Sequence, residues 1–212
     1  KQPTKVSGMT RILRTMTALI ASGALLFPPA FAEDSIEYAT KPNRGLNAIQ
    51  HNQLDTLFDA LRHSKSKQEA QDHEQEIWRI WMTPDDTEIG ALMDRAMLEI
   101  QEQRYSESLQ TLDTIVSRSP KYAEAWNQRA LVHFQLKQYD TSLEDIAATL
   151  KLEPRHFGAL IGRSKIYLEL GKSKLAEESL LKALRYHPYL PGRGLLLMIP
   201  AEPIPEEDLP FI

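Results

Sequence analysis

The chain has 212 residues, of which 42% are hydrophobic and 25% are charged, so it can form one globular domain with a sizeable core. Its formal net charge of −4 argues against a general nucleic-acid-binding protein, which would carry a basic stripe. With no cysteine and six histidines, the chain offers little material for a metal or thiol site, and we expect no cofactor.

Residues 1–32 have the layout of a Sec-type signal peptide. Two arginines precede the apolar segment ALIASGALLF, which is too short to span a bilayer comfortably. Ala30 and Ala32 place small side chains where a signal peptidase recognises its substrate, so we expect cleavage before Glu33. This predicts export to the periplasm of a Gram-negative bacterium, with no stable membrane anchor after cleavage. An uncleaved N-terminal anchor is the alternative.

Residues 33–50 are polar and indicate a flexible leader. Hydrophobic residues at helical spacing then predict two helices, over 52–64 and 69–81. The apolar residues of the second helix gather at its end, in the segment IWRIW. We expect residues 51–86 to form a degenerate helix pair that caps the N-terminal end of a larger stack, since stacked repeats need an atypical terminal unit.

A proline recurs at a fixed interval of 34 residues, at Pro120, Pro154 and Pro188. A fixed period of this length indicates that one supersecondary unit has been copied and stacked. Because proline cannot continue a helix, each of the three marks the end of a unit's second helix. The units are residues 89–120, 123–154 and 157–188.

Within the three units the same kinds of residue recur in register. Small residues occupy the eighth and twentieth positions, where two helices must approach closely, and large apolar residues occupy the twenty-fourth. The three sets are Ala96, Ala130 and Ser164; Ser108, Ser142 and Ala176; and Leu112, Ile146 and Leu180.

This pattern resembles the tetratricopeptide repeat (TPR), most closely in the second unit, AEAWNQRALVHFQLKQYDTSLEDIAATLKLEP. The resemblance spans residues 89–188 and implies an all-α fold, a right-handed α-solenoid of antiparallel helix pairs. The segments IWRIWMTPDD, EAWNQRA and EPRHFGAL also resemble exported TPR proteins of Gram-negative, more narrowly alphaproteobacterial, bacteria. The family serves many partners, so the resemblance implies binding of a protein or peptide and names no partner.

An arginine stands at the seventh position of every unit, where the family usually has an apolar residue: Arg95, Arg129 and Arg163. Two interpretations remain open. In the favoured one the aliphatic stem packs on the core and the head group reaches water. In the other the arginines form a basic ladder for an anionic ligand. Asp145 is a candidate internal partner of Arg129.

The resemblance also implies that the first helix of each unit lines a concave groove, with the second, fifth, ninth and twelfth positions facing inward. The groove residues expected to contact a partner are Met93, Met97, Asn127, Leu131, Ile161 and Lys165. Their mostly apolar character suits an extended or helical peptide with apolar anchors. We interpret the twelfth-position residues Ile100, Phe134 and Leu168 as core. A strong clamp for a terminal carboxylate is not expected, since only one amide and one ammonium could serve in it.

No catalytic or metal-binding constellation emerges from the spacing of the titratable residues. His63 and His73 are ten residues apart, whereas a zinc-binding helix favours closer spacing. Residues 192–194, Gly-Arg-Gly, lack the lysine and the strand context of a phosphate loop. His156 and His187 flank the closing prolines and are interpreted as turn residues. We therefore predict that the protein is not an enzyme.

Residues 189–212 are rich in proline, which prevents a long helix. Three interpretations remain open, of which we favour the first and the third. The segment LLLMI folds back as an irregular cap on the last unit, the tail binds the groove of another copy, or the end derives from a frameshifted or truncated gene. Without a cap, Leu180, Leu181 and Leu184 would be partly exposed and would invite weak self-association.

These features favour a non-enzymatic periplasmic adaptor, scaffold or assembly factor that holds a protein segment in its concave groove. The alternative is a self-associating structural module driven by an uncapped C-terminal unit. Neither interpretation includes a nucleic-acid partner.

Overall fold

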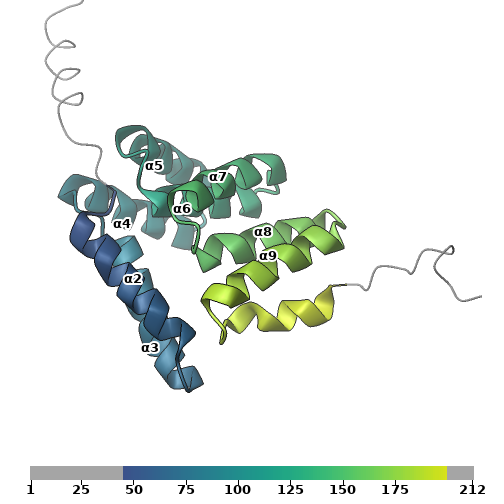
Figure 1. Cartoon of the computed structure of the whole chain (residues 1–212). Helices are drawn as coiled ribbons and strands as arrows, with labels where there is room; N and C mark the ends of the chain where they lie inside the picture. Colours follow the sequence, from purple (N-terminus) through teal and green to yellow (C-terminus); the bar gives the residue numbers. More distant parts are fainter. Residues whose placement is uncertain (1–44, 200–212) are drawn as a thin grey trace, which may run out of the picture. The chain divides into compact units, whose positions relative to one another are not determined.

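The computed structural model describes residues 45–199, which form eight α-helices and one 3₁₀ helix (Figure 1). The helices are α2 (Ala48–Arg62), α3 (Lys67–Met82), α4 (Thr87–Gln101), α5 (Tyr105–Arg118), α6 (Ala123–Gln135), α7 (Tyr139–Leu152), α8 (Phe157–Glu169), α9 (Ser173–Tyr186) and η1 (Pro191–Met198). The predicted all-helical fold of sequential helix pairs is confirmed. The predicted cleavage site at Ala30, Ala32 and Glu33, most of the predicted leader and residues 200–212 lie outside the described residues. No helix in the described range is long and apolar enough to cross a membrane.

The second helix of each unit ends two residues before its proline: α5 at Arg118, α7 at Leu152 and α9 at Tyr186. The turn between the two helices of a unit also recurs with the period. Gln103, Lys137 and Gly171 have φ angles of 58°, 58° and 68°, in the left-handed region. One residue with this backbone conformation reverses the chain in every unit.

The small residues at the eighth and twentieth positions lie where the two helices of a unit touch. The Ser142 hydroxyl donates a hydrogen bond to the Ala130 carbonyl over 2.7 Å, and the Ser164 hydroxyl donates to the Ala176 carbonyl over 2.8 Å. All four residues are almost fully buried. A larger side chain at either position would force the two helices apart.

The seventh-position arginines have partners within the chain. Arg129 forms a two-pronged ion pair with Asp145, with N–O distances of 2.8 and 2.6 Å, and its remaining nitrogen donates to Asp113. Arg163 donates to the Ser179 hydroxyl over 3.0 Å. In the first unit, Arg95 pairs with the buried Glu99, 2.8 Å away. Arg129 and Arg163 therefore tie neighbouring helices together, whereas Arg95 and Glu99 pair within α4.

The first described helix begins within the predicted leader because Asn47 caps it. The Asn47 side chain accepts from the Gln50 backbone N–H, and the Gln50 side chain accepts from the Asn47 backbone N–H, both over 2.9 Å. This reciprocal arrangement is a capping box, which fixes where a helix begins. The helix therefore starts at Ala48 and not at residue 52.

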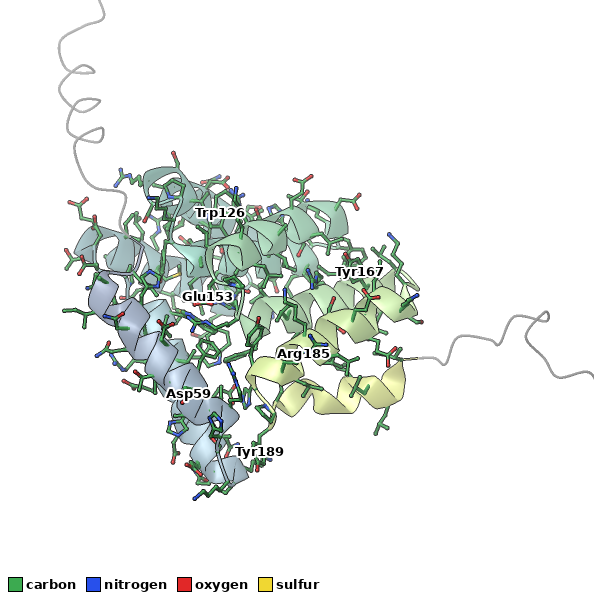
Figure 2. All side chains as sticks on the ribbon, viewed as in Figure 1. Asp59, Trp126, Glu153, Tyr167, Arg185 and Tyr189 are labelled. Atoms are coloured by element: carbon green, nitrogen blue, oxygen red, sulfur yellow. The ribbon has the colours of Figure 1, made fainter. Side chains whose placement is uncertain are left out.

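The pair α2 and α3, named here the N-terminal pair, differs from the predicted cap at the end of the stack. Its apolar residues share one core cluster with the third unit, where Phe58 packs against Phe157 and Tyr186 with ring centroids 6.3 and 6.4 Å apart. Helix α2 lies against α9, and Figure 2 labels Asp59 and Arg185 on these two helices. The apolar faces of the pair are thus covered by helices far away in the sequence.

Each residue two places after a closing proline is buried and takes part in this packing. The Tyr122 hydroxyl donates to the Trp81 carbonyl over 2.8 Å, and burial raises the pKa of this hydroxyl. The His156 ring stacks on Trp81, with centroids 4.0 Å apart, and Leu190 joins the same core cluster. His156, expected to be a turn residue, is in fact fully buried.

The end of the described chain covers the last unit. Helix η1, drawn in yellow in Figure 1, packs against α9, and Leu195, Leu196 and Ile199 contact the core cluster that contains Leu180. Leu180 is 0% exposed, whereas Leu181 is 44% exposed. The chain thus folds back over the last unit, as the first interpretation of the tail predicted, and the alternative of an uncapped unit does not fit these residues.

Candidate functional site

A pocket of about 310 Å³ opens between the first helices of the second and third units, α6 and α8. It lies on the surface that the fifth and ninth positions of these helices share. Four of the six predicted groove residues line it: Asn127, Leu131, Ile161 and Lys165. The sequence thus predicted which side chains come together here, and their contact with a partner stays a prediction.

The two predicted groove residues of the first unit do not reach this pocket. Met93 is 0% exposed and belongs to the core cluster of the first unit, so its predicted partner contact is wrong. Met97 is partly buried against the same cluster. Leu46, just before the N-terminal pair, and Met82, the last residue of α3, also pack there. These residues cover the surface that a free first unit would offer to a partner.

One wall of the pocket comes from outside the repeats. Trp78 of α3 lies over Gly158, so close that a Cβ atom on this glycine would stand 2.7 Å from the ring. Only glycine permits this approach, because no real Cβ makes such a contact. The aromatic cluster IWRIW was the sequence signal for this wall, but its helical spacing gave no indication of what it would touch.

The twelfth position of α6 is also part of the pocket. Phe134, interpreted from the sequence as core, is partly buried and lines the wall, with its ring centroid 5.9 Å from that of Tyr139. The other lining residues include the small ones Ala130, Ala159 and Gly162 and the aliphatic ones Ile146 and Ile166.

A buried polar network lies behind the pocket. Glu124 is fully buried and accepts hydrogen bonds from His156 Nε2 over 2.7 Å and from Gln128 Nε2 over 2.5 Å. Because His156 Nδ1 accepts the Ala159 backbone N–H, its proton resides on Nε2. Asn127 also donates to Glu124, over 3.1 Å. The network holds α6, the start of α8 and both amide side chains in place.

This network leaves one acceptor without a partner. Gln128 uses its amide nitrogen for Glu124, while its Oε1 atom is buried and has no hydrogen-bond partner among the described residues. Gln128 is 6% exposed and lines the pocket. Buried acceptors are nearly always satisfied in native structures, so this oxygen is an exception within the network.

The pocket lining carries positive charge and no negative charge. Lys165 is exposed and, within residues 45–199, has no ion-pair partner, and none of the residues that line the pocket carries a carboxylate. No group of three histidine, aspartate or glutamate side chains in the described part of the chain could hold a metal ion. The site therefore offers apolar walls and one cation.

Comparison with known proteins places these features in a family context. A family model described as tetratricopeptide repeat matches residues 93–148 and 137–191, which include every pocket residue except Trp78. A TPR repeat-containing protein of Rhizobium etli is 32% identical over 102 residues. The aligned part covers 48% of this chain and 48% of that protein, so the chain spans about half the length of this relative.

Proposed function

Because residues 93–191 match a family model of the tetratricopeptide repeat, whose members generally mediate protein–protein interactions, we propose that the protein is a non-enzymatic adaptor or assembly factor. It holds a segment of a protein partner in the pocket between α6 and α8. The observation that carries this proposal is the pocket of about 310 Å³, lined by predicted groove residues from two consecutive units. Open apolar surface of this kind on a soluble domain marks an interaction site.

The proposed place of action is the periplasm. This part of the proposal is supported by the sequence of residues 1–32, with its basic start, short apolar segment and small residues before Glu33. Mass spectrometry of the protein isolated from its own bacterium would find Glu33 as the first residue. An intact N-terminus in the isolated protein would contradict export with cleavage.

The experiment that tests the binding function compares two double variants in pull-downs from periplasmic extract. Leu131→Arg/Ile161→Arg places two cations on the pocket walls, and we expect it to lose the partners that the wild-type protein recovers. Leu131 is 40% exposed, whereas Ile161 is partly buried against a core cluster, so the fold of this variant must be checked.

The matched control is Leu98→Arg/Leu181→Arg, which changes two leucines that are 50% and 44% exposed and lie outside the pocket. We expect it to recover the wild-type partners. Circular dichroism is the check that both double variants are folded. Recovery of the same partners by the pocket variant would refute the proposed function.

A further inference from the structure

We infer that the pocket accepts one large apolar side chain of an extended segment whose neighbouring residues carry carboxylates, with Trp78 as a wall that determines specificity. This inference rests on the proposed function and names the chemistry of the segment that the pocket takes. It also makes the N-terminal pair part of the binding site, although the pair lies outside the matched repeats.

The dimensions of the pocket favour a single anchor side chain. Its volume of about 310 Å³ suits one aromatic or long aliphatic side chain with adjoining backbone. This volume cannot enclose an α-helix, which is about 10–12 Å wide with its side chains, so the pocket takes a single side chain of the bound segment. A Cβ atom on Gly162 would meet only the Ile146 side chain, 3.6 Å away, so part of the space exists because this position has no side chain.

An extended segment can bring one side chain into the pocket while its backbone continues along the protein surface. The anchor side chain then lies between Trp78 and Phe134, the two aromatic residues that line the pocket.

The charge of the site selects the neighbours of the anchor. Lys165 is the one charged residue that lines the pocket, and its ammonium has no carboxylate partner within residues 45–199. A segment with acidic residues beside the anchor gains from this cation, whereas a basic segment is repelled. The partner segment is therefore apolar at its centre and acidic at its flanks.

Titration of the ¹⁵N-labelled protein, purified from cells that express the whole chain, tests this inference by NMR. The probes are three blocked peptides, GSEFESG, GSKFKSG and GSEAESG. We expect GSEFESG to shift the Trp78 indole N–H and the Gly158 and Gly162 amides saturably. It should bind about fivefold more tightly than GSKFKSG at low salt. The alanine peptide should bind about tenfold more weakly or not at all, because it lacks the anchor.

Three variants locate the effect in this pocket. Lys165→Glu reverses the preference between the acidic and basic peptides without touching the core. Gly162→Leu fills the pocket and abolishes binding, whereas Gly162→Ala retains it and serves as the matched control. Trp78→Leu keeps an apolar wall and weakens GSEFESG binding.

Absence of saturable shifts with GSEFESG, equal affinity for the acidic and basic peptides, or unchanged binding by the folded Gly162→Leu variant would each overturn the inference. Its failure can be told apart from failure of the proposed function. If the pull-down partners still depend on Leu131 and Ile161 while the peptides fail, only the chemistry assigned to the segment is wrong. If the partners do not depend on these residues, the proposed function itself fails.

Discussion

At the scale of single residues, the turn inside each unit shows how the backbone conformation of a position determines whether a side chain there lowers stability. Gly171 occupies the left-handed position of the third unit, while the first two units place Gln103 and Lys137 there. A side chain at such a φ angle is strained by contact with its own backbone. A side chain at Gly171 would not clash with the rest of the protein, since a Cβ atom there would meet nothing within 4 Å.

Gly171→Ala is expected to lower the free energy of unfolding by about 1 kcal/mol, because alanine must adopt the left-handed conformation. The same chemical change at Gly162, inside α8, is expected to raise it by about 0.5–1 kcal/mol, because alanine favours the helix. Urea unfolding of the two variants measures both effects, with the wild-type protein as reference. Changes of the same sign at the two sites would contradict this explanation.

At the scale of elements, α3 is held to the third unit by polar contacts as well as by its apolar face. Glu74 of α3 accepts from His187, the residue after α9, over 3.0 Å, although the two lie 113 positions apart. The hydrogen bond and the charge of His187 hold the pKa of Glu74 below its ordinary value of 4.5, against the opposing effect of burial. The other helix of the N-terminal pair, α2, also has a polar contact with the third unit: Arg155, just before α8, pairs with Asp55 over 2.7 Å.

The lowered pKa of Glu74 predicts an acid-sensitive contact between α3 and the end of α9. Because the folded-state pKa lies below 4.5, the stabilisation by Glu74 is fully present above that pH and is lost as the pH falls through the folded-state value. The free energy of unfolding of the wild-type protein should therefore fall more steeply from about pH 5 to about pH 2 than that of Glu74→Gln.

Urea unfolding at several pH values measures the difference between the two profiles. The control is Glu76→Gln, which removes a surface pair with Arg79 within α3 and should change the profile less. Parallel profiles of the wild-type protein and Glu74→Gln would show that the Glu74–His187 contact does not contribute to stability.

At the scale of the described domain, residues 45–199, the N-terminal pair ties the first and last parts of the chain together. In an open solenoid each repeat contacts only its neighbours, and the ends unfold independently. Here one core cluster contains Leu54 and Phe58 of α2 together with Leu180 and Ala183 of α9. Contacts across such long sequence separations make the unfolding of distant elements interdependent.

This arrangement predicts that the domain unfolds in one transition. In a Trp126→Phe background, tryptophan fluorescence reports only on Trp78 and Trp81 of α3, while circular dichroism reports on all helices. The two signals should give the same urea midpoint. Phe58→Ala empties a fully buried site and should lower the free energy of unfolding by about 3–5 kcal/mol. The midpoints of the two signals should fall together. An earlier fluorescence transition would show that the pair detaches from a stable repeat stack.

Features that depend on neighbours along the chain could be predicted from the sequence. The prolines, the small residues and the apolar spacing act within one helix pair, so their 34-residue period was enough to predict the units, the helix ends and the groove positions on α6 and α8. The cluster of tryptophans in α3 was visible too, but not its contacts.

What covers the apolar face of the N-terminal pair became known only from the tertiary structure. Trp78 meets Gly158 and Trp81 meets His156 across about eighty positions of sequence, and no local spacing encodes such a meeting. The burial of Met93 and the fold-back of η1 follow from the same kind of packing. Repeat geometry is a property of each helix pair, whereas the shape of the pocket depends on which distant side chains share one core.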